Sequence, residues 1–172
     1  MALSLLLIGT LFISKPDPIS SEVMTIGAIP DQNPEKLNRL YKLLSTELSE
    51  QLKVPVRYLP VTNYTASVTA FRTGNLDLVW FGGLTGVQAR RQRPGSIVLA
   101  QRNIDKKFHS VFIANASTSL SEIKDINGLK SLKGKRFTFG SESSTSGRLM
   151  PQYFLQKAGV LLSDFKGRRP GF

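Results

Sequence analysis

The sequence predicts an α/β protein with a largely parallel sheet. Short β-rich runs alternate with amphipathic helical stretches from Val23 onwards, which is the pattern of repeated strand-helix-strand units. A second alternation of the same kind begins near residue 118. With 41% hydrophobic and 20% charged residues, the 172-residue chain has the composition of a folded globular protein.

The first elements are a strand and a long helix. Residues 22–30 form a β-rich run that stops at Pro30. The following helix is predicted over 33–53, because Asn33 stands at the cap position and Pro34 suits the first helical turn. Its apolar residues recur at spacings of three and four: Leu37, Leu40, Tyr41, Leu44, Leu48 and Leu52.

The alternation continues as far as residue 117. Turn residues and apolar runs mark the boundaries of each further element. We expect a strand at 54–61, a helix at 63–74 ended by Gly74, a buried strand at 76–83, a helix near 85–93 and strands at 97–101 and 109–117. Residues 22–117 are therefore expected to form a first α/β lobe that is nearly complete.

A second α/β unit is expected over residues 118–172. It starts with a short helix and a turn at Gly134, followed by a strand at 136–139, a loop rich in hydroxyl residues, and a helix capped by Gly159. A parallel sheet needs more than one strand. We therefore expect this second lobe to be truncated.

Composition excludes several kinds of chemistry. The chain has no Cys, which excludes disulfides, thiolate metal sites and a catalytic thiol. His109 is the single His, so a His-based zinc site or a Ser-His-Asp triad is not expected. We predict no catalytic residue, no metal and no cofactor, and hence a protein that is not an enzyme. The formal charge of +11 favours anionic partners.

The N-terminus, residues 1–21, resembles a signal peptide. An apolar run from Ala2 to Ile13 precedes Pro16 and Pro18, and its length suits the hydrophobic region of such a peptide. No Lys or Arg precedes the run. The alternative is a buried first strand or helix, although the two prolines separate the run from the strand expected at 22–30. We expect export to the periplasm.

The hydroxyl-rich loop is the first candidate site. Ser144, Thr145 and Ser146, followed by Gly147, come between a predicted strand and a predicted helix. Free N–H groups at a helix start form an anion site, and neighbouring hydroxyls add donors. The spacing is not that of a P-loop. A solvent-exposed, capped helix is the alternative interpretation.

Two further stretches lie at predicted strand ends. Tyr64 follows a strand and begins a helix, so its hydroxyl is placed over the carboxyl edge of the sheet, where open α/β folds bind ligands. A packed aromatic with a solvated tip is the alternative. Gly82 and Gly83 allow a close approach of a ligand or of an adjacent helix, or simply form a tight turn.

Nucleic-acid binding is not predicted. The basic stretch at 90–107 lacks interleaved aromatic residues and a recognition helix. A solvated basic face that attracts anions is the simpler interpretation.

Four segments together resemble a known family. "VTNY" (61–64), "DLVWFGG" (77–83), "FHSVFIAN" (108–115) and "FTFGSESSTSGRLMPQYFL" (137–155) are similar to the phosphate/phosphite/phosphonate-type substrate-binding proteins of ABC importers, including a selenate-binding branch. The resemblance covers about residues 22–172. It implies a two-lobed, periplasmic-binding-protein-like fold of type II that closes on a small oxyanion and delivers it to ABC permease subunits in the inner membrane.

The resemblance also implies ligand residues. The run of Ser144, Thr145 and Ser146 matches the family's oxyanion loop, and Tyr64 matches the Tyr of a T-D-Y motif in which Asn63 here replaces Asp. Phe81 and Phe108 stand where some members carry a Tyr. Loss of those two hydroxyls favours a small, bare oxyanion: phosphonate, phosphite, phosphate or selenate.

One alternative function stays open at this point. Similar two-lobed folds serve as effector-sensing domains of regulators. The apolar N-terminus and the lack of a helix-turn-helix segment favour a role in transport. Members of the family continue beyond a "PGF"-like segment, whereas this chain stops at "RRPGF", which predicts a truncated product or fragment.

Overall fold

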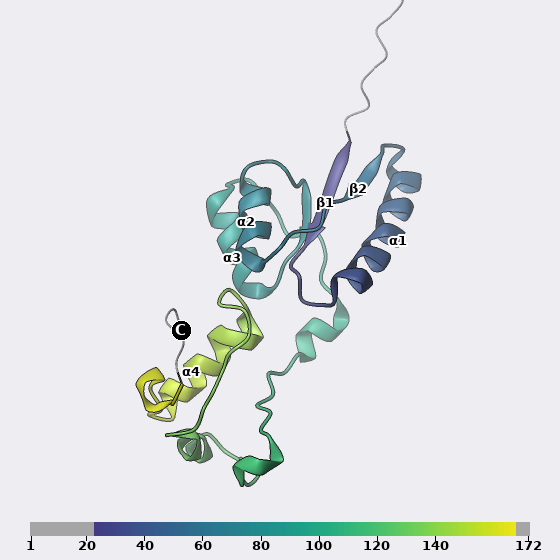
Figure 1. Cartoon of the computed structure of the whole chain (residues 1–172). Helices are drawn as coiled ribbons and strands as arrows, with labels where there is room; N and C mark the ends of the chain where they lie inside the picture. Colours follow the sequence, from purple (N-terminus) through teal and green to yellow (C-terminus); the bar gives the residue numbers. More distant parts are fainter. Residues whose placement is uncertain (1–22, 168–172) are drawn as a thin grey trace, which may run out of the picture.

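The computed structural model describes residues 23–167. The predicted signal-like segment 1–21 and the last five residues lie outside this range. We call residues 23–96 the sheet unit, 97–118 the linking segment and 119–167 the α4 unit (Figure 1). The predicted division after residue 117 stays a prediction. None of the helices in the described range combines the length and the apolar character needed to cross a membrane.

The sheet unit is built on three parallel strands. β1 (Met24–Ala28) lies between β2 (Val56–Tyr58) and β3 (Leu78–Trp80), so the strand order is β2-β1-β3. Ile26 pairs with Tyr58, and Ala28 pairs with Trp80. The predicted α/β fold with a parallel sheet is confirmed, and the carboxyl ends of all three strands meet at one edge.

Three helices cover the two faces of this sheet. α1 (Pro34–Leu52) lies on one side of β1, and α2 (Tyr64–Arg72) and α3 (Gly83–Gln92) lie on the other (Figure 1). The helices predicted at 33–53 and 63–74 are confirmed. α3 starts two residues earlier than predicted. Sheet and helices enclose a core of Ile26, Ala28, Ile29, Leu37, Val68, Leu76 and Ala89.

α1 begins as predicted but buries less than its pattern indicates. The Asn33 side chain accepts hydrogen bonds from the N–H groups of Glu35 and Lys36, so it is the N-cap. Of the apolar stripe, Leu37 is buried, whereas Leu40 and Leu44 are exposed. The reason is that α1 packs along β2, a strand of three residues that is too short to cover the whole stripe.

A glycine and a carboxylate hold the middle of the sheet together. A Cβ on Gly27 would stand 2.6 Å from Leu76 Cδ1, so only glycine lets Leu76 fill the core beside β1. Asp77 Oδ2 accepts hydrogen bonds from Thr25 N (2.7 Å) and Thr25 Oγ1 (2.8 Å). These contacts tie the start of β3 to β1 and fix their register.

The strands predicted at 97–101 and 109–117 are wrong. The linking segment is extended but carries no sheet pairing, and its ordered parts are the short 3-10 helices η1 (Asn103–Lys107) and η2 (Ala116–Thr118). No strand lies beside these residues in the described part of the chain. A β-rich run forms a strand only where a neighbour can accept its backbone hydrogen bonds.

The α4 unit has its own small core. Its elements are the 3-10 helices η3 (Asn127–Leu132) and η5 (Leu162–Asp164), the π-turn η4 (Thr145–Leu149), and α4 (Met150–Lys157). The buried cluster consists of Leu129, Leu132, Leu155, Ala158, Val160 and Phe165. The strand predicted at 136–139 is wrong, because only one parallel bridge, between Arg136 and Lys166, forms there.

Gly159 terminates α4, as predicted. Gly159 has a φ of 74°. Its N–H donates to the Gln156 carbonyl, and the Val160 N–H donates to the Leu155 carbonyl, each at 2.9 Å. This pair of bonds is a Schellman motif, which needs a residue that tolerates a left-handed backbone. Apolar residues on α4 itself stay exposed, including Tyr153 and Phe154.

Candidate functional site

The hydroxyl loop, residues 141–147, is closed by its own backbone. Gly140 N–H donates to the Gly147 carbonyl at 2.8 Å, and Ser144 N–H donates to the Ser141 carbonyl at 2.9 Å. The buried Ser144 hydroxyl accepts a hydrogen bond from Gly147 N–H at 3.0 Å. Ser144 therefore caps the turn that leads into α4, as the sequence indicates.

The helix after the loop opens more widely than predicted. Residues of η4 form a π-turn in which Leu149 N–H reaches the Ser144 carbonyl at 3.0 Å, and Arg148 N–H shares the same acceptor. Such wide turns occur frequently at functional sites because they displace side chains from regular helical positions. Thr145 and Ser146 are the first two residues of this wide turn, ahead of α4.

Thr145 joins the loop to the sheet unit. Its Oγ1 accepts a hydrogen bond from the backbone N–H of Leu84 at 2.7 Å, in the first turn of α3. A Cβ on Gly83 would stand only 3.3 Å from Thr145 Oγ1. The two glycines at the start of α3 thus admit the hydroxyl loop, an outcome that differs from the ligand, the adjacent helix and the tight turn considered from the sequence.

Tyr64 lies on the same side of the sheet unit. It is the first residue of α2, whose N-cap is Asn63, with Asn63 Oδ1 accepting from Ala66 N–H at 2.8 Å. Burial and then the Asp31 carboxylate raise the pKa of the Tyr64 phenol, and a side-chain interaction with Ser144 opposes the rise. The Ser144 side chain, which belongs to the other unit, thus acts on the Tyr64 phenol.

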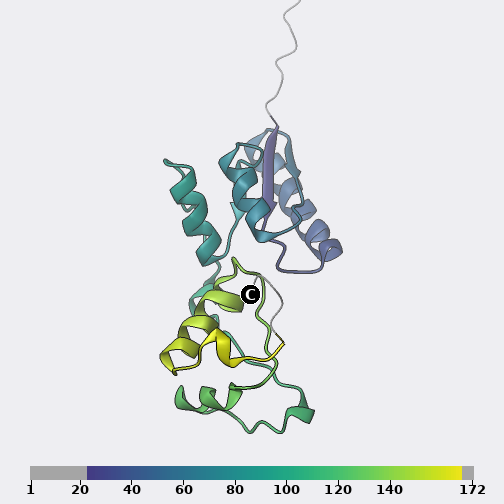
Figure 2. The same ribbon diagram turned by 60° about the vertical axis from the view of Figure 1, so that its left-hand side comes forward.

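A second hydroxyl pair supports this arrangement. Thr65 Oγ1 and Ser143 Oγ are 3.5 Å apart. Figures 1 and 2 both show the loop meeting the ends of α2 and α3 that adjoin the carboxyl edge of the sheet. The structure therefore brings the start of α2, with Tyr64, to the loop that carries Ser144, Thr145 and Ser146, and these are four of the six residues predicted as ligand contacts.

Ser146 belongs to the same loop and keeps its hydroxyl available. Ser146 is partly buried, and no hydrogen bond of its side chain occurs within residues 23–167. A hydroxyl in this position can donate one hydrogen bond and accept others. Its geometry is compatible with the predicted ligand contact.

The two aromatic candidates differ in their surroundings. Phe81 packs edge to face on Phe71 of α2, with ring centroids 5.6 Å apart. Phe108 is 59% exposed at the end of η1, in the linking segment. Their proposed contact with a ligand stays a prediction.

The basic residues near the site differ in their roles. Arg148 follows the loop, and its guanidinium lies 4.3 Å from the centre of the Phe139 ring. Arg93 is not part of a solvated face, because its Nη1 donates to the carbonyls of Phe71 (2.8 Å) and Leu76 (3.2 Å). The interpretation of residues 90–107 as a solvated basic face is therefore wrong for Arg93.

A tyrosine cluster near the ends of β1 and β2 escaped the sequence reasoning. The rings of Tyr41 and Tyr58 stack with centroids 4.8 Å apart. Burial, followed by the Asp31 carboxylate, raises the pKa of Tyr41 to about 12. Arg102 stacks on Trp80 close by and pairs with Asp105 at 2.7 Å. Only the tertiary arrangement joins these residues, since no local motif links them.

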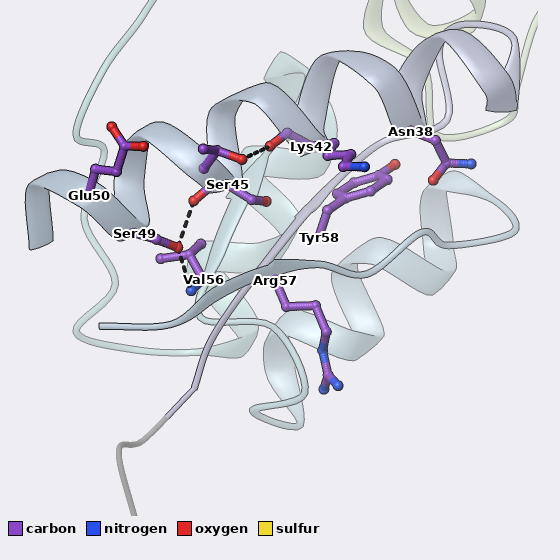
Figure 3. Close-up of a pocket in the computed structure, with 9 residues that line it drawn as sticks. Asn38, Lys42, Ser45, Ser49, Glu50, Val56, Arg57 and Tyr58 are labelled. Atoms are coloured by element: carbon purple, nitrogen blue, oxygen red, sulfur yellow. Dashed lines mark hydrogen bonds between the residues drawn. The ribbon is translucent and has the colours of Figure 1, made fainter. Parts of the chain in front are cut away.

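A pocket of about 550 Å³ lies elsewhere, between α1 and β2 (Figure 3). Its hydroxyls are engaged within the protein: Ser45 donates to the Tyr41 carbonyl, Ser49 donates to the Ser45 carbonyl, and Val56 N–H donates to Ser49 Oγ. The last of these bonds joins the helix to the edge strand. The pocket is a packing feature of the sheet unit, distinct from the hydroxyl loop.

The sheet unit turns the carboxyl edge of its parallel strands towards the hydroxyl loop of the α4 unit. This arrangement is typical of one class of protein. The arrangement is that of an α/β substrate-binding protein, in which a ligand lies between two units. The chain belongs to the family described as ABC transporter, phosphonate, periplasmic substrate-binding protein, whose model matches residues 26–171.

Individual relatives agree with this family. The chain is 60% identical over 159 residues to the "Probable ABC transporter phosphite binding protein PhnD1" of Prochlorococcus marinus, covering 92% of this chain and 54% of the relative. It is 31% identical over 146 residues to the "Phosphate-import protein PhnD" of Mycolicibacterium smegmatis, covering 83% of this chain and 44% of the relative.

A solved structure gives the same result. The chain is similar to PhnD1 from Prochlorococcus marinus in complex with methylphosphonate, with a TM-score of 0.85 and 61% identity, over 88% of this chain and 56% of that one. The predicted family and fold class are thereby confirmed. The chain spans about half the length of the curated relatives it matches.

Proposed function

We propose that this chain is the oxyanion-binding part of a substrate-binding component of an ABC importer. It would bind a small phosphorus oxyanion between the hydroxyl loop and the carboxyl edge of the sheet and perform no chemistry on it. Ser144, Thr145, Ser146 and Tyr64 are the proposed ligand residues, with Phe81 and Phe108 at the rim.

The convergence of the hydroxyl loop on the sheet unit carries this proposal. Thr145 contacts the start of α3, and Ser143 lies beside Thr65 in the first turn of α2. Hydroxyls and helix N–H groups are neutral donors that match the several acceptor oxygens of a tetrahedral anion. Neutral donors hold an anion without a strong ion pair, which suits a protein that must also release it.

The relatives support phosphorus oxyanions as the ligand class. One is named for phosphite, another for phosphate, and the similar solved structure contains methylphosphonate. Selenate and sulfate share the tetrahedral shape and form the comparison set for a test. Delivery to ABC permease subunits in the inner membrane, and export to the periplasm through residues 1–21, belong to the same proposal, because the family is described as periplasmic.

Binding can be tested on a chain of the relatives' length. Residues 22–167 would be continued with the C-terminal part of the Prochlorococcus relative and titrated calorimetrically with phosphite, methylphosphonate, phosphate, selenate and sulfate. We expect saturable binding of at least one phosphorus oxyanion and weaker binding of sulfate. If none of the five anions binds to this folded chain, the proposed function is wrong.

A further inference from the structure

We propose that the first turn of α3 positions Thr145 as a hydrogen-bond donor for the oxyanion, so the sheet unit sets part of the affinity of a loop that belongs to the α4 unit. This inference rests on the proposed function, because it concerns the same site. It assigns a positioning role to Gly83 and to the backbone N–H of Leu84.

α3 lacks a capping side chain of its own. Its N-cap is Gly82, and the Thr85 hydroxyl, inside the first turn, reaches back to Gly82 N–H at 3.0 Å. A helix start leaves its first N–H groups without partners, and a Ser, Thr, Asp or Asn at the N-cap normally takes one of them. Here Thr145 Oγ1 takes the Leu84 N–H from 61 residues away.

The direction of this hydrogen bond decides what Thr145 can do next. The N–H of Leu84 donates, so Thr145 Oγ1 uses a lone pair and keeps its own proton free. A hydroxyl that accepts a hydrogen bond becomes a better donor, since the two bonds polarise one another. The positive end of the α3 dipole therefore acts on the anion through the Thr145 hydroxyl.

Gly83 also determines the position of Thr145, through steric fit. A Cβ at this position would stand 3.3 Å from Thr145 Oγ1 and 3.6 Å from its Cγ2. An alanine there would push the threonine away from Leu84 without removing any hydroxyl from the loop. Gly86, in the same helix, has only an ordinary contact with Phe81 Cβ at 3.5 Å and provides a matched control.

The other loop hydroxyls do not depend on α3. Ser144 Oγ is held by Gly147 N–H within its own loop, and Ser143 faces Thr65 of α2. Among the described loop residues, Thr145 is thus the donor whose orientation is set by a backbone N–H of α3. Separating the units would release Thr145 and leave Ser144 in place.

The cap is tested on the chain as it is. Amide exchange would be followed by NMR for Leu84 and, as a control, for Ala66, whose N–H is capped by Asn63 within α2. Thr145→Val should accelerate exchange at Leu84 by roughly threefold to tenfold, the range of one neutral hydrogen bond, and Thr145→Ser should restore protection. Equal exchange at Leu84 in all three chains would overturn the cap.

The positioning role is tested on the chain extended with the relative's C-terminal part. Gly83→Ala should weaken methylphosphonate binding by at least about fivefold, within the range of one hydrogen bond. Gly86→Ala should bind like the parent. If Gly83→Ala also binds like the parent, Thr145 is not positioned by α3. If the parent binds no oxyanion, the proposed function fails, whereas the exchange result at Leu84 still decides whether Thr145 caps α3.

Discussion

Gly140 and Gly147 close the hydroxyl loop by direct backbone contact, with Gly140 N–H donating to the Gly147 carbonyl at 2.8 Å. A Cβ on Gly147 would stand 3.0 Å from Ser144 Oγ and 3.2 Å from Gly140 Cα. The loop therefore presents its hydroxyls only because two glycines allow its ends to touch.

Gly147→Ala should destabilise the α4 unit. The added methyl group meets backbone at Gly140, which cannot move aside as a flexible side chain would, so we expect a loss of about 1–3 kcal/mol in the free energy of unfolding. Urea denaturation followed by circular dichroism measures this loss. Gly86→Ala is the control with the opposite sign, because alanine inside a helix stabilises it by roughly 0.5–1 kcal/mol. An unchanged midpoint for Gly147→Ala would show that the loop opens without cost.

Removal of loop hydroxyls should weaken oxyanion binding. In the extended chain, Thr145→Val and Ser146→Ala should each reduce affinity by roughly ten- to a hundredfold, since hydrogen bonds to a charged group contribute about 1.5–3 kcal/mol. Calorimetric titration with phosphite and methylphosphonate measures the change.

Thr46→Val serves as the matched control for these variants. Thr46 is an exposed threonine on α1 whose hydroxyl donates to the Lys42 carbonyl, so its loss should leave binding unchanged. Parental affinity in both Thr145→Val and Ser146→Ala would reduce the loop to a helix cap and contradict the proposed ligand set.

Alkaline pH should destabilise the sheet unit through its tyrosines. Burial raises the pKa of Tyr41 to about 12, and the pKa values of Tyr58 and Tyr64 are raised as well. The folded chain therefore keeps phenol protons that the unfolded chain releases near pH 10, so the free energy of unfolding falls as pH rises from about 10 towards 12. Below about pH 10 these groups are protonated in both states and add no pH dependence.

Tyr41→Phe should flatten this decline. The variant keeps the ring stacked on Tyr58 and removes the phenol with the largest rise in pKa. Urea unfolding at several values from about pH 8 to about pH 12 gives the slopes for parent and variant. Identical slopes would show that Tyr41 titrates in the folded chain as it does in the unfolded chain.

The backbone amides of the linking segment should exchange freely with solvent. The exposed apolar residues of this segment should promote association of the chain with itself. Ile97 is 76% exposed and Ile113 is 94% exposed, and both lie in stretches without sheet pairing. We expect rapid amide exchange over 97–101 and 109–115, and weaker protection over 119–167 than over the sheet unit. Exposed apolar residues of this kind also favour concentration-dependent association, measurable by sedimentation velocity.

Ile113→Asp should reduce that association without changing stability. The side chain contributes almost nothing to a core, so the free energy of unfolding should stay within about 0.5 kcal/mol of the parent. Leu129→Ala, in the buried cluster of the α4 unit, is the contrasting variant and should cost about 2–5 kcal/mol. A monomeric parent at all concentrations would contradict the role assigned to the exposed segment.

Much of the local structure was predictable because its causes lie within a few residues. The Asn33 cap, the helix at 63–74 and the Schellman turn at Gly159 each depend on neighbouring backbone groups. The parallel strands β1, β2 and β3 were predictable from short apolar runs between helices. The hydroxyl loop was recognisable from its composition, and its function was predicted from the resemblance to the family.

The failed strand predictions have one common physical cause. The runs at 97–101, 109–117 and 136–139 have suitable residues, but strand formation depends on a partner that local sequence does not describe. The role of Arg93 is not predictable for a similar reason. The carbonyls that it binds belong to Phe71 and Leu76, which are distant in the sequence.

The sequence by itself determined the Asn33 cap of α1, the end of α4 at Gly159, the three paired strands and the hydroxyls offered by residues 144–146. Only the tertiary structure decided where those hydroxyls point. Thr145 meets Leu84 across 61 residues, at a helix start whose own cap is a glycine. Capping and periodicity act over one turn of chain, whereas the contact between the two units depends on how their cores pack, and no local pattern encodes that packing.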